Sequence, residues 1–497
     1  MIYINGQIHT MMDHAEVCSA MIVRDQIIIE TGTTEQILKL QQQGEQIIDL
    51  QKNCVVPGFN DSHMHFICTG LCADEVKLHN SRSIQEIQNE CKQYLLSNAD
   101  CTHISGTGWS EQIIDNSVYP TKEDLDLVST QIPIVISRIC MHIGVANSAA
   151  LQLYEAVTSK SLTEEQKQSG LIKESQLFEL QGLLPQPSVD KLHRIILKQQ
   201  AALNAVGITS VQSDDLFYVN AIQAYEQAQL NNELTVRVHL QRRFDRKSIE
   251  GPFLTNGPLK FFADGSLGAK TAALQEPYLH SDQHGLMLFT DNELKQKLTF
   301  QSVVHAIGDA AITQVVNTIH QLDTQNANRS GIVHFQITTP EIIEKVARGN
   351  ILLLVQPVFL LSDHELLNER ISSELQNTSY SWNSCLKQKI HLSFGTDAPI
   401  ESFNPLLNIY AAVTRRSKIG VLNANECLTV EESVKCYTAE SAYAEFKEQT
   451  KGKLAKGFLA DFVVLEKDIF TINQEEIKDV RVLQTYVGGK KVFDLQK

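Results

Sequence analysis

The chain has 497 residues, 43% of them hydrophobic and 20% charged, which is typical of a globular protein with more than one domain. Its formal net charge is −15 and no basic block occurs, so we expect no nucleic-acid partner. Ten cysteines occur without a Cys-x-x-Cys pair, so we expect free thiols. No signal-peptide pattern opens the chain, which indicates a cytoplasmic location. No segment approaches the roughly 18 apolar residues of a membrane span, so we expect no membrane partner.

Short β-prone segments occupy the first 54 residues and the last 40 or so. Asn5-Gly6 predicts a hairpin turn, and a second hairpin is expected around residues 24–26. Near the C-terminus, residues 461–465 predict a strand and residues 485–493 predict a hairpin with a Gly-Gly turn. We expect the two chain ends to pair in one composite β-sandwich domain, formed by residues 1–56 plus 440–497.

Between the ends, apolar strand-like runs alternate with helical patterns. One run precedes His63, and the others are 208–211, 235–240, 259–263, 300–305, 331–335, 351–355 and 391–397. Eight near-continuous apolar strands separated by helices are what a parallel (β/α)8 barrel requires. The predicted fold class is therefore α/β, with a TIM-like barrel formed by residues 57–66 plus 191–439.

Residues 67–190 are too numerous for one crossover between neighbouring barrel strands. They contain a capping-box pattern at 83–86 and strand candidates at 103–106 and 132–139. We expect an α/β insertion here, lying over the active-site face of the barrel.

Barrel enzymes build their sites at the C-terminal ends of the strands, and ligand-type residues occur at these positions. His63 and His65 alternate at one strand end, so both side chains project to the same face and suit a metal such as zinc. Singly, each such residue also has a structural interpretation, such as a core histidine or a turn aspartate. Together they indicate a metal site, and the candidates are His63, His65, Lys260, His305, His334 and Asp397.

The chain resembles metal-dependent hydrolases of the amidohydrolase superfamily, and more narrowly the YtcJ-like group of amidohydrolase family 3 that includes N-substituted formamide deformylase. The resemblance covers essentially the whole chain. It is carried by residues 57–65, 260–268, 305–309, 396–401, 410–415 and 457–465.

This resemblance implies a site with two divalent metal ions, zinc being the first expectation and manganese an alternative. His63, His65 and Asp397 would hold one ion and His305 and His334 the other. A CO2-derived carbamate on Lys260 would bridge them, since a bare ammonium would repel two dications.

The implied reaction is hydrolysis of a carbon–nitrogen bond other than a peptide bond, in a small-molecule amide or N-substituted formamide. The nucleophile would be a metal-bridged hydroxide, and Asp397 would act as the catalytic residue that shuttles the proton. The oligomeric state is left open, with a homodimer as one expectation.

Two other functions are considered. A mononuclear-metal deaminase of the same superfamily is the alternative, because residues 305–309 also resemble a deaminase segment; Lys260 argues against it. A catalytically silent barrel that binds partners would have lost ligands, and none is lost. One departure from the family pattern is Val333, which stands where an acidic residue usually precedes the strand-six histidine.

Three residues are candidates for substrate binding. Trp109 could stack on an organic substituent, although a core tryptophan is an equal alternative. His142 could hydrogen-bond the substrate or only a loop backbone. Asp264 follows the lysine strand and could contact the substrate, orient Lys260 or shape the glycine-rich loop.

Overall fold

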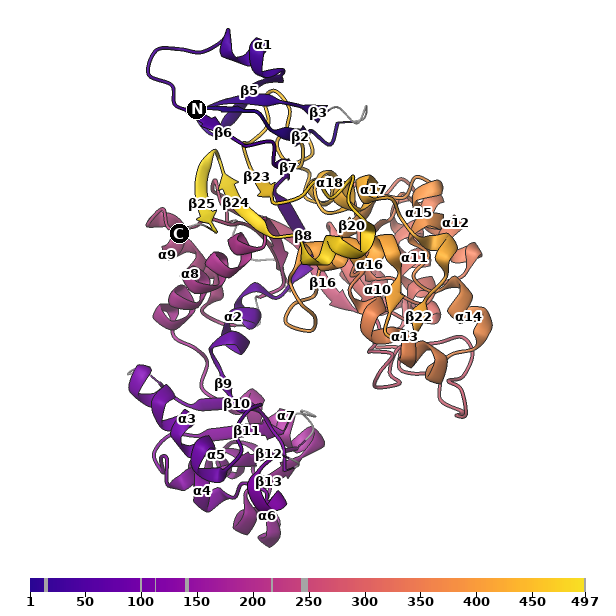
Figure 1. The fold of residues 1–497 in the computed structure, drawn as a ribbon. Coiled ribbons are helices and arrows are strands. Elements are labelled where there is room, and N and C mark those ends of the chain that lie inside the picture. Colours follow the sequence, from indigo (N-terminus) through magenta and orange to yellow (C-terminus); the bar gives the residue numbers. More distant parts are fainter. Residues whose placement is uncertain are drawn as a thin grey trace. The chain divides into compact units, whose positions relative to one another are not determined.

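An eight-stranded parallel sheet forms the centre of the protein and curves into a nearly closed barrel (Figure 1). The computed structural model describes residues 1–12, 17–98, 101–111, 113–138, 143–215, 218–242 and 249–495. In chain order the barrel strands are β8 (Phe59–Met64), β14 (Ile208–Ser213), β15 (Arg237–Arg242), β16 (Leu254–Phe262), β17 (Ser302–Ala306), β18 (Gly331–His334), β19 (Leu352–Val355) and β20 (Leu392–Phe394). The predicted barrel is confirmed.

Most barrel strands are rich in apolar residues because both of their faces are covered, although β8 and β14 also carry several buried polar side chains. Every residue of β8, β14, β18, β19 and β20 is buried. Helices follow the strands, as a parallel sheet with right-handed crossovers requires. They include α8 (Val189–Ala205), α9 (Ala221–Leu230), α11 (Asp309–Leu322), α12 (Pro340–Arg348), α13 (Phe359–Arg370) and α16 (Pro405–Thr414).

The barrel closes where the end of β8 meets the segment that follows β20. The backbone N–H of Asp397 donates to the carbonyl of His63 over 2.8 Å, and the N–H of His65 donates to the carbonyl of Ala398 over 2.8 Å. A Cβ on Gly395 would lie 2.5 Å from the backbone nitrogen of His63, so only glycine allows the two segments to approach this closely. We call this contact the closing seam.

Two further sheets are built from the chain ends. The six-stranded sheet has the order β25 (Lys490–Asp494), β24 (Val482–Val487), β23 (Phe462–Leu465), β7 (Cys54–Pro57), β2 (Gln7–His9) and β3 (Val17–Cys18). Antiparallel pairing of β7 with β23 joins the N-terminal and C-terminal segments, seen in Figure 1 as indigo beside yellow. The four-stranded sheet has the order β5 (Ile27–Gly32), β4 (Ala20–Arg24), β1 (Ile2–Ile4) and β6 (Ile47–Asp49).

Two of the three predicted hairpins are confirmed. Asp25 and Gln26 join β4 to β5 with φ values of 47° and 70°, and Gly488 and Gly489 join β24 to β25 with φ values of 56° and 71°. A two-residue turn with both central φ angles positive matches the twist of antiparallel strands.

The hairpin predicted at Asn5-Gly6 is wrong. Asn5 has a φ of 55°, but Gly6 does not have a positive φ, so the turn that would fold β2 back onto β1 does not form. Instead β1 pairs with β4 and β6, while β2 pairs with β3 and β7. The chain therefore passes from one sheet to the other at this point.

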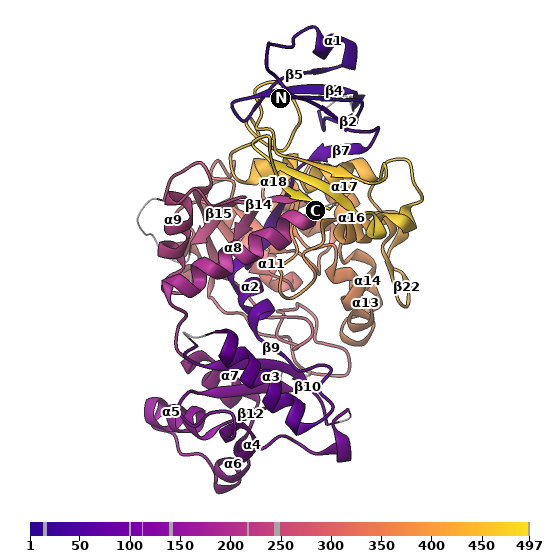
Figure 2. The same cartoon turned by 60° about the vertical axis from the view of Figure 1, so that its left-hand side comes forward.

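Residues 70–188 form a second compact unit with its own core. Its five-stranded sheet has the order β13 (Leu171–Lys173), β12 (Ile143–Ala146), β11 (Ile134–Arg138), β10 (Ile104–Trp109) and β9 (Val76–Lys77), and its helices include α3 (Ile84–Ser97) and α5 (Ser148–Thr158) (Figure 2). Ser83 caps α3 by accepting the N–H of Glu86. No helix in the described ranges is long and apolar enough to cross a membrane.

A buried ion pair connects the barrel to the sheet of the chain ends. Arg237 on β15 donates two hydrogen bonds to the carboxylate of Asp461, over 2.7 and 3.0 Å, and both residues are 7% exposed. Substitution Asp461→Asn should lower the free energy of unfolding by roughly 3–5 kcal/mol, because it leaves a buried guanidinium without its countercharge.

Urea unfolding of the Asp461→Asn variant measures this effect. The matched control is Glu466→Gln, which breaks the surface pair with Arg481 and should cost about 0–1 kcal/mol. An equal decrease in the free energy of unfolding in the two variants would show that the buried pair stabilises the protein no more than the surface pair does.

Candidate metal site

The six ligand-type residues predicted from the sequence lie together at the C-terminal end of the barrel. His65 Nε2 lies 3.0 Å from Asp397 Oδ1, and His63 Nε2 lies 3.4 Å from the same oxygen. One ligand atom from each of these three residues lies within 4.8 Å of the others, a spacing that can hold a metal ion. Lys260 Nζ is 3.3 Å from His63 Nε2.

The other two histidines, His305 and His334, form a pair near His63. The rings of His305 and His334 are 4.4 Å apart, and those of His63 and His334 are 5.9 Å apart. The charge of Lys260 lowers the pKa of both His63 and His305, so its amine lies close to both groups of candidate ligands. The arrangement therefore has two clusters with a lysine near both.

Two of these residues have an unusual backbone conformation. His334 has a φ of 80° and Asp397 a φ of 55°, in the left-handed region that side chains other than glycine rarely adopt. Such strain tends to persist at functional sites, where the surrounding structure holds it in place. At Asp397 the hydrogen bonds of the closing seam supply that constraint.

Burial keeps most of the imidazoles neutral. It lowers the pKa of His63 and of His305 to about 4, with the charge of Lys260 adding to the effect, and it holds the pKa of His334 well below its ordinary value. Neutral imidazole is the form that binds metal, so these three histidines need not lose a proton at neutral pH.

His65 and Asp397 behave as an ion pair. Burial alone would lower the pKa of His65, but hydrogen bonding to Asp397 raises it to about 9. Burial would raise the pKa of Asp397, yet His63 and His65 hold it well below its ordinary range. The carboxylate of Asp397 therefore stabilises positive charge beside it, as a metal ligand does.

Hydrogen bonds orient three of the rings. His65 Nδ1 lies 2.9 Å from the carbonyl of Asp214, and His305 Nε2 lies 2.9 Å from the carbonyl of Gly265. A carbonyl can only accept, so these nitrogens carry the protons and the opposite nitrogens are left as ligands. His334 Nδ1 is held in the same way by Oε1 of Gln356 over 2.7 Å.

Sequence reasoning missed Gln356 and Asp61. Gln356 directly follows β19, at the strand-end position that the other candidates occupy, and this position was the available signal. Asp61 alternates with His63 on β8. Its fully buried carboxylate accepts hydrogen bonds from the backbone N–H of His63 and from the N–H and hydroxyl of Thr396 across the closing seam. Burial raises the pKa of Asp61 to about 7.

The residues predicted to bind substrate lie in different surroundings. The carboxylate of Asp264 accepts backbone N–H groups of Ala273, Ile307 and Gly308, so it fastens the loops that follow β16 and β17. Trp109 is fully buried in the core of the second unit, where its indole donates to Ile136 over 3.1 Å. His142 lies outside the described residues. Substrate contacts of all three stay predictions.

A cavity of about 210 Å³ adjoins the histidine pair. Phe359 in its wall stacks on His334, and Ile307 follows the strand that carries His305. Leu267, Leu366 and Ile400 add further apolar surface to the wall, and Asp363 and Glu401 give it an acidic part. Burial raises the pKa of Asp363 to about 6, so its carboxyl group is ionised at neutral pH.

The chain is similar to known proteins over nearly its whole length. YtcJ of Bacillus subtilis (strain 168) is 32% identical to the chain, over 99% of each protein, and N-substituted formamide deformylase of Arthrobacter pascens is 23% identical, over 98% of the chain and 97% of that enzyme. The crystal structure of an uncharacterized metal-dependent hydrolase from Pyrococcus horikoshii OT3 has a TM-score of 0.81 at 27% identity and covers 95% of this chain and 99% of its own. The amidohydrolase family model matches residues 46–493, and the chain belongs to the amidohydrolase family.

Proposed function

We propose that the protein is a metal-dependent amidohydrolase that cleaves a carbon–nitrogen bond other than a peptide bond, in a small N-acyl or N-formyl compound. The observation that carries the proposal is the convergence of His63, His65 and Asp397 with Lys260 and the His305–His334 pair at one end of the barrel. The similarity to N-substituted formamide deformylase supports the choice of bond.

The donor set suits two divalent ions, for which zinc is our first choice. His63, His65 and Asp397 would hold one ion, and His305 and His334 the other. Lys260 is 3% exposed and close to both clusters, so as a carbamate it would supply a bridging anion where an ammonium would repel the ions. When bound, the ions activate water at neutral pH and polarise the scissile carbonyl.

Asp397 has a second role in the proposed reaction. Its carboxylate is ionised, so it could accept the proton of a metal-activated water at a carboxylate oxygen. It can then deliver that proton to the leaving nitrogen, which departs as a neutral amine. The closing seam keeps its backbone fixed during both transfers.

The adjoining cavity indicates the class of substituent that is accepted. Apolar side chains such as Leu267, Ile307 and Phe359 suit an aliphatic or aromatic group, and the ionised Asp363 favours a substituent that also carries an ammonium group or hydrogen-bond donors. We therefore propose an amide with an apolar body and a polar or cationic end.

A screen of N-acyl and N-formyl compounds with the metal-reconstituted enzyme tests the proposed function, by following the release of amine and carboxylate.

Asp397→Asn should reduce kcat by about 10²-fold or more, because it removes both a ligand and the proton acceptor. Glu365→Gln on the exposed face of α13 serves as the control. Release of ammonia from aminated heterocycles, with one metal ion per chain, would instead identify the deaminase alternative.

Gln356→Ala should weaken metal binding by about 10–100-fold, because His334 loses the partner that fixes its tautomer and its ring orientation. Competition with a chelator, followed by metal analysis, measures the affinity. Gln212→Ala removes a buried strand glutamine that bonds only the carbonyl of Ser441 among the described residues, and it should leave the affinity unchanged. Indistinguishable affinities in the two variants would exclude the orienting role of Gln356.

The acidic part of the cavity predicts a pH-dependent preference. As the pH rises through about 6, Asp363 loses its proton, so kcat/KM for a cationic substrate should rise relative to that for a neutral substrate of the same size. The ratio of the two values removes the effect of groups that act on both substrates. In Asp363→Asn the ratio should no longer depend on pH, and an unchanged profile would contradict this assignment.

A further inference from the structure

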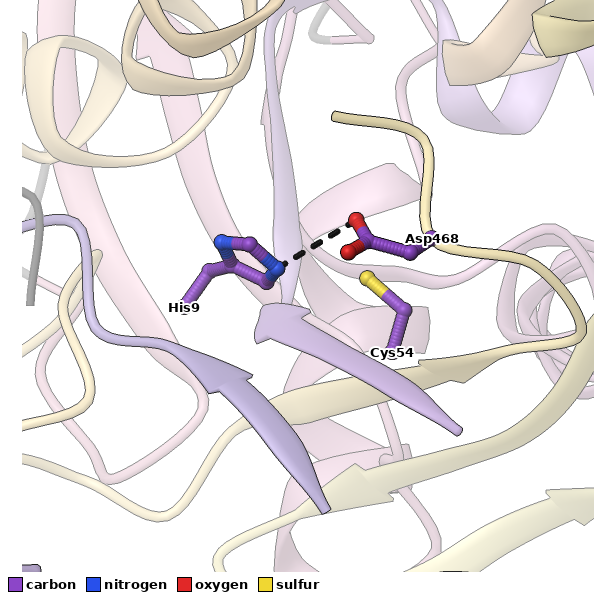
Figure 3. Close-up of side chains that lie close together, drawn as sticks. All are labelled: His9, Cys54 and Asp468. Carbon is purple, nitrogen blue, oxygen red and sulfur yellow. Dashed lines mark ion pairs between the residues drawn. The ribbon is translucent and has the colours of Figure 1, made fainter. Parts of the chain in front are cut away.

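A second group of metal-ligand side chains lies outside the barrel, in the six-stranded sheet of the chain ends (Figure 3). His9 ends β2, Cys54 begins β7, and Asp468 follows β23. Gln7 on β2 pairs with Cys54 on the parallel strand β7, so His9 is the diagonal neighbour of Cys54 on the same face. Figure 3 shows the imidazole, the thiol and the carboxylate turned toward one another.

The spacing of the three donors fits a tetrahedral ion. One donor atom from each residue lies within 4.8 Å of the other two, and His9 Nε2 is 3.3 Å from Asp468 Oδ1. Zinc binds nitrogen and oxygen at about 2.0–2.1 Å, which places two tetrahedral ligands about 3.3 Å apart. The 3.3 Å separation of this ion pair therefore also fits two ligands of one ion.

The burial of these side chains and the contacts that hold them are also those of a metal site. Cys54 is 1% exposed, and the buried His9 Nε2 forms an ion pair with the carboxylate of Asp468. Phe470 stacks on the His9 ring at 3.9 Å and fixes its orientation.

We propose that His9, Cys54 and Asp468 bind one divalent transition-metal ion, zinc by preference, at a site separate from the barrel. A thiolate with an imidazole selects zinc over magnesium or calcium, which prefer oxygen ligands. On binding, Cys54 releases its thiol proton to solvent and forms the metal–sulfur bond. The side chains of His9 and Asp468 are 11% and 16% exposed, so water can reach the fourth position.

The ion would join segments from both ends of the chain. His9 and Cys54 belong to the N-terminal strands, whereas Asp468 belongs to the C-terminal segment after β23. The ion would therefore reinforce the pairing of β7 with β23. Its effect would be on stability, because the extended stretch of β7 and β8 separates Cys54 from the barrel ligand His63.

Cobalt substitution tests the proposal on the full-length protein. The barrel candidates are His, Lys and Asp residues, so a cobalt–thiolate charge-transfer absorption can come only from a cysteine site. We expect this absorption in the wild-type protein and its loss in Cys54→Ser, together with one metal ion fewer per chain by elemental analysis. The matched control is Cys18→Ser in the neighbouring strand β3, whose side chain lies on the opposite face from His9 and should leave both readouts unchanged.

Two further variants make the result decisive. If Cys54→Ser does not fold, His9→Gln keeps the thiol and should still lose one ion per chain. The double variant His63→Asn/His65→Asn should keep the thiolate absorption, which separates this site from the proposed barrel site. Absence of the absorption in the cobalt-loaded wild type, or equal metal content in Cys54→Ser and Cys18→Ser, would overturn the proposal.

Discussion

The metal site depends on the closing seam, where the end of β8 pairs with the segment after β20. Backbone hydrogen bonds join His63 to Asp397 and His65 to Ala398. The same pairing that closes the barrel therefore brings the three candidate ligands His63, His65 and Asp397 together. The constraint is strong because it is made of backbone hydrogen bonds in a buried, well-packed place. A ligand set held in this way needs little reorganisation when an ion binds.

Asp61 is the side chain that stabilises the seam. Its buried carboxylate accepts hydrogen bonds from both segments, and its exposure is essentially zero. A buried carboxylate is tolerated only where several donors compensate for lost hydration. The seam therefore combines three features, namely backbone pairing, a bridging carboxylate and the close approach that Gly395 allows.

Much of this architecture could be predicted from the sequence, because the strands, the ligand positions and the turns each have a distinct local pattern. Most barrel strands are buried on both faces and therefore contain short apolar runs. The ligand positions could be found because they follow those runs, at the end where parallel strands present their functional residues. The turn at Gly488-Gly489 could be predicted because a two-residue hairpin demands residues that accept a positive φ, and the turn at Asp25-Gln26 because apolar β-prone runs flank it.

The rest depends on contacts between distant segments, which a local pattern does not contain. Asn5-Gly6 has the composition of a hairpin turn, but β1 pairs with β4 and β6 instead of β2, and the chain passes from one sheet to the other. The roles of Asp61 and Gln356 become visible only when Thr396 and His334 lie beside them. The same holds for His9, Cys54 and Asp468, which are far apart in the sequence and which only the fold brings together.

Pairing of β7 with β23 also has a consequence for biosynthesis. The N-terminal strands leave the ribosome first, yet their sheet gains its neighbours only after nearly the whole chain has been made, so their open edge must be protected from aggregation during that interval.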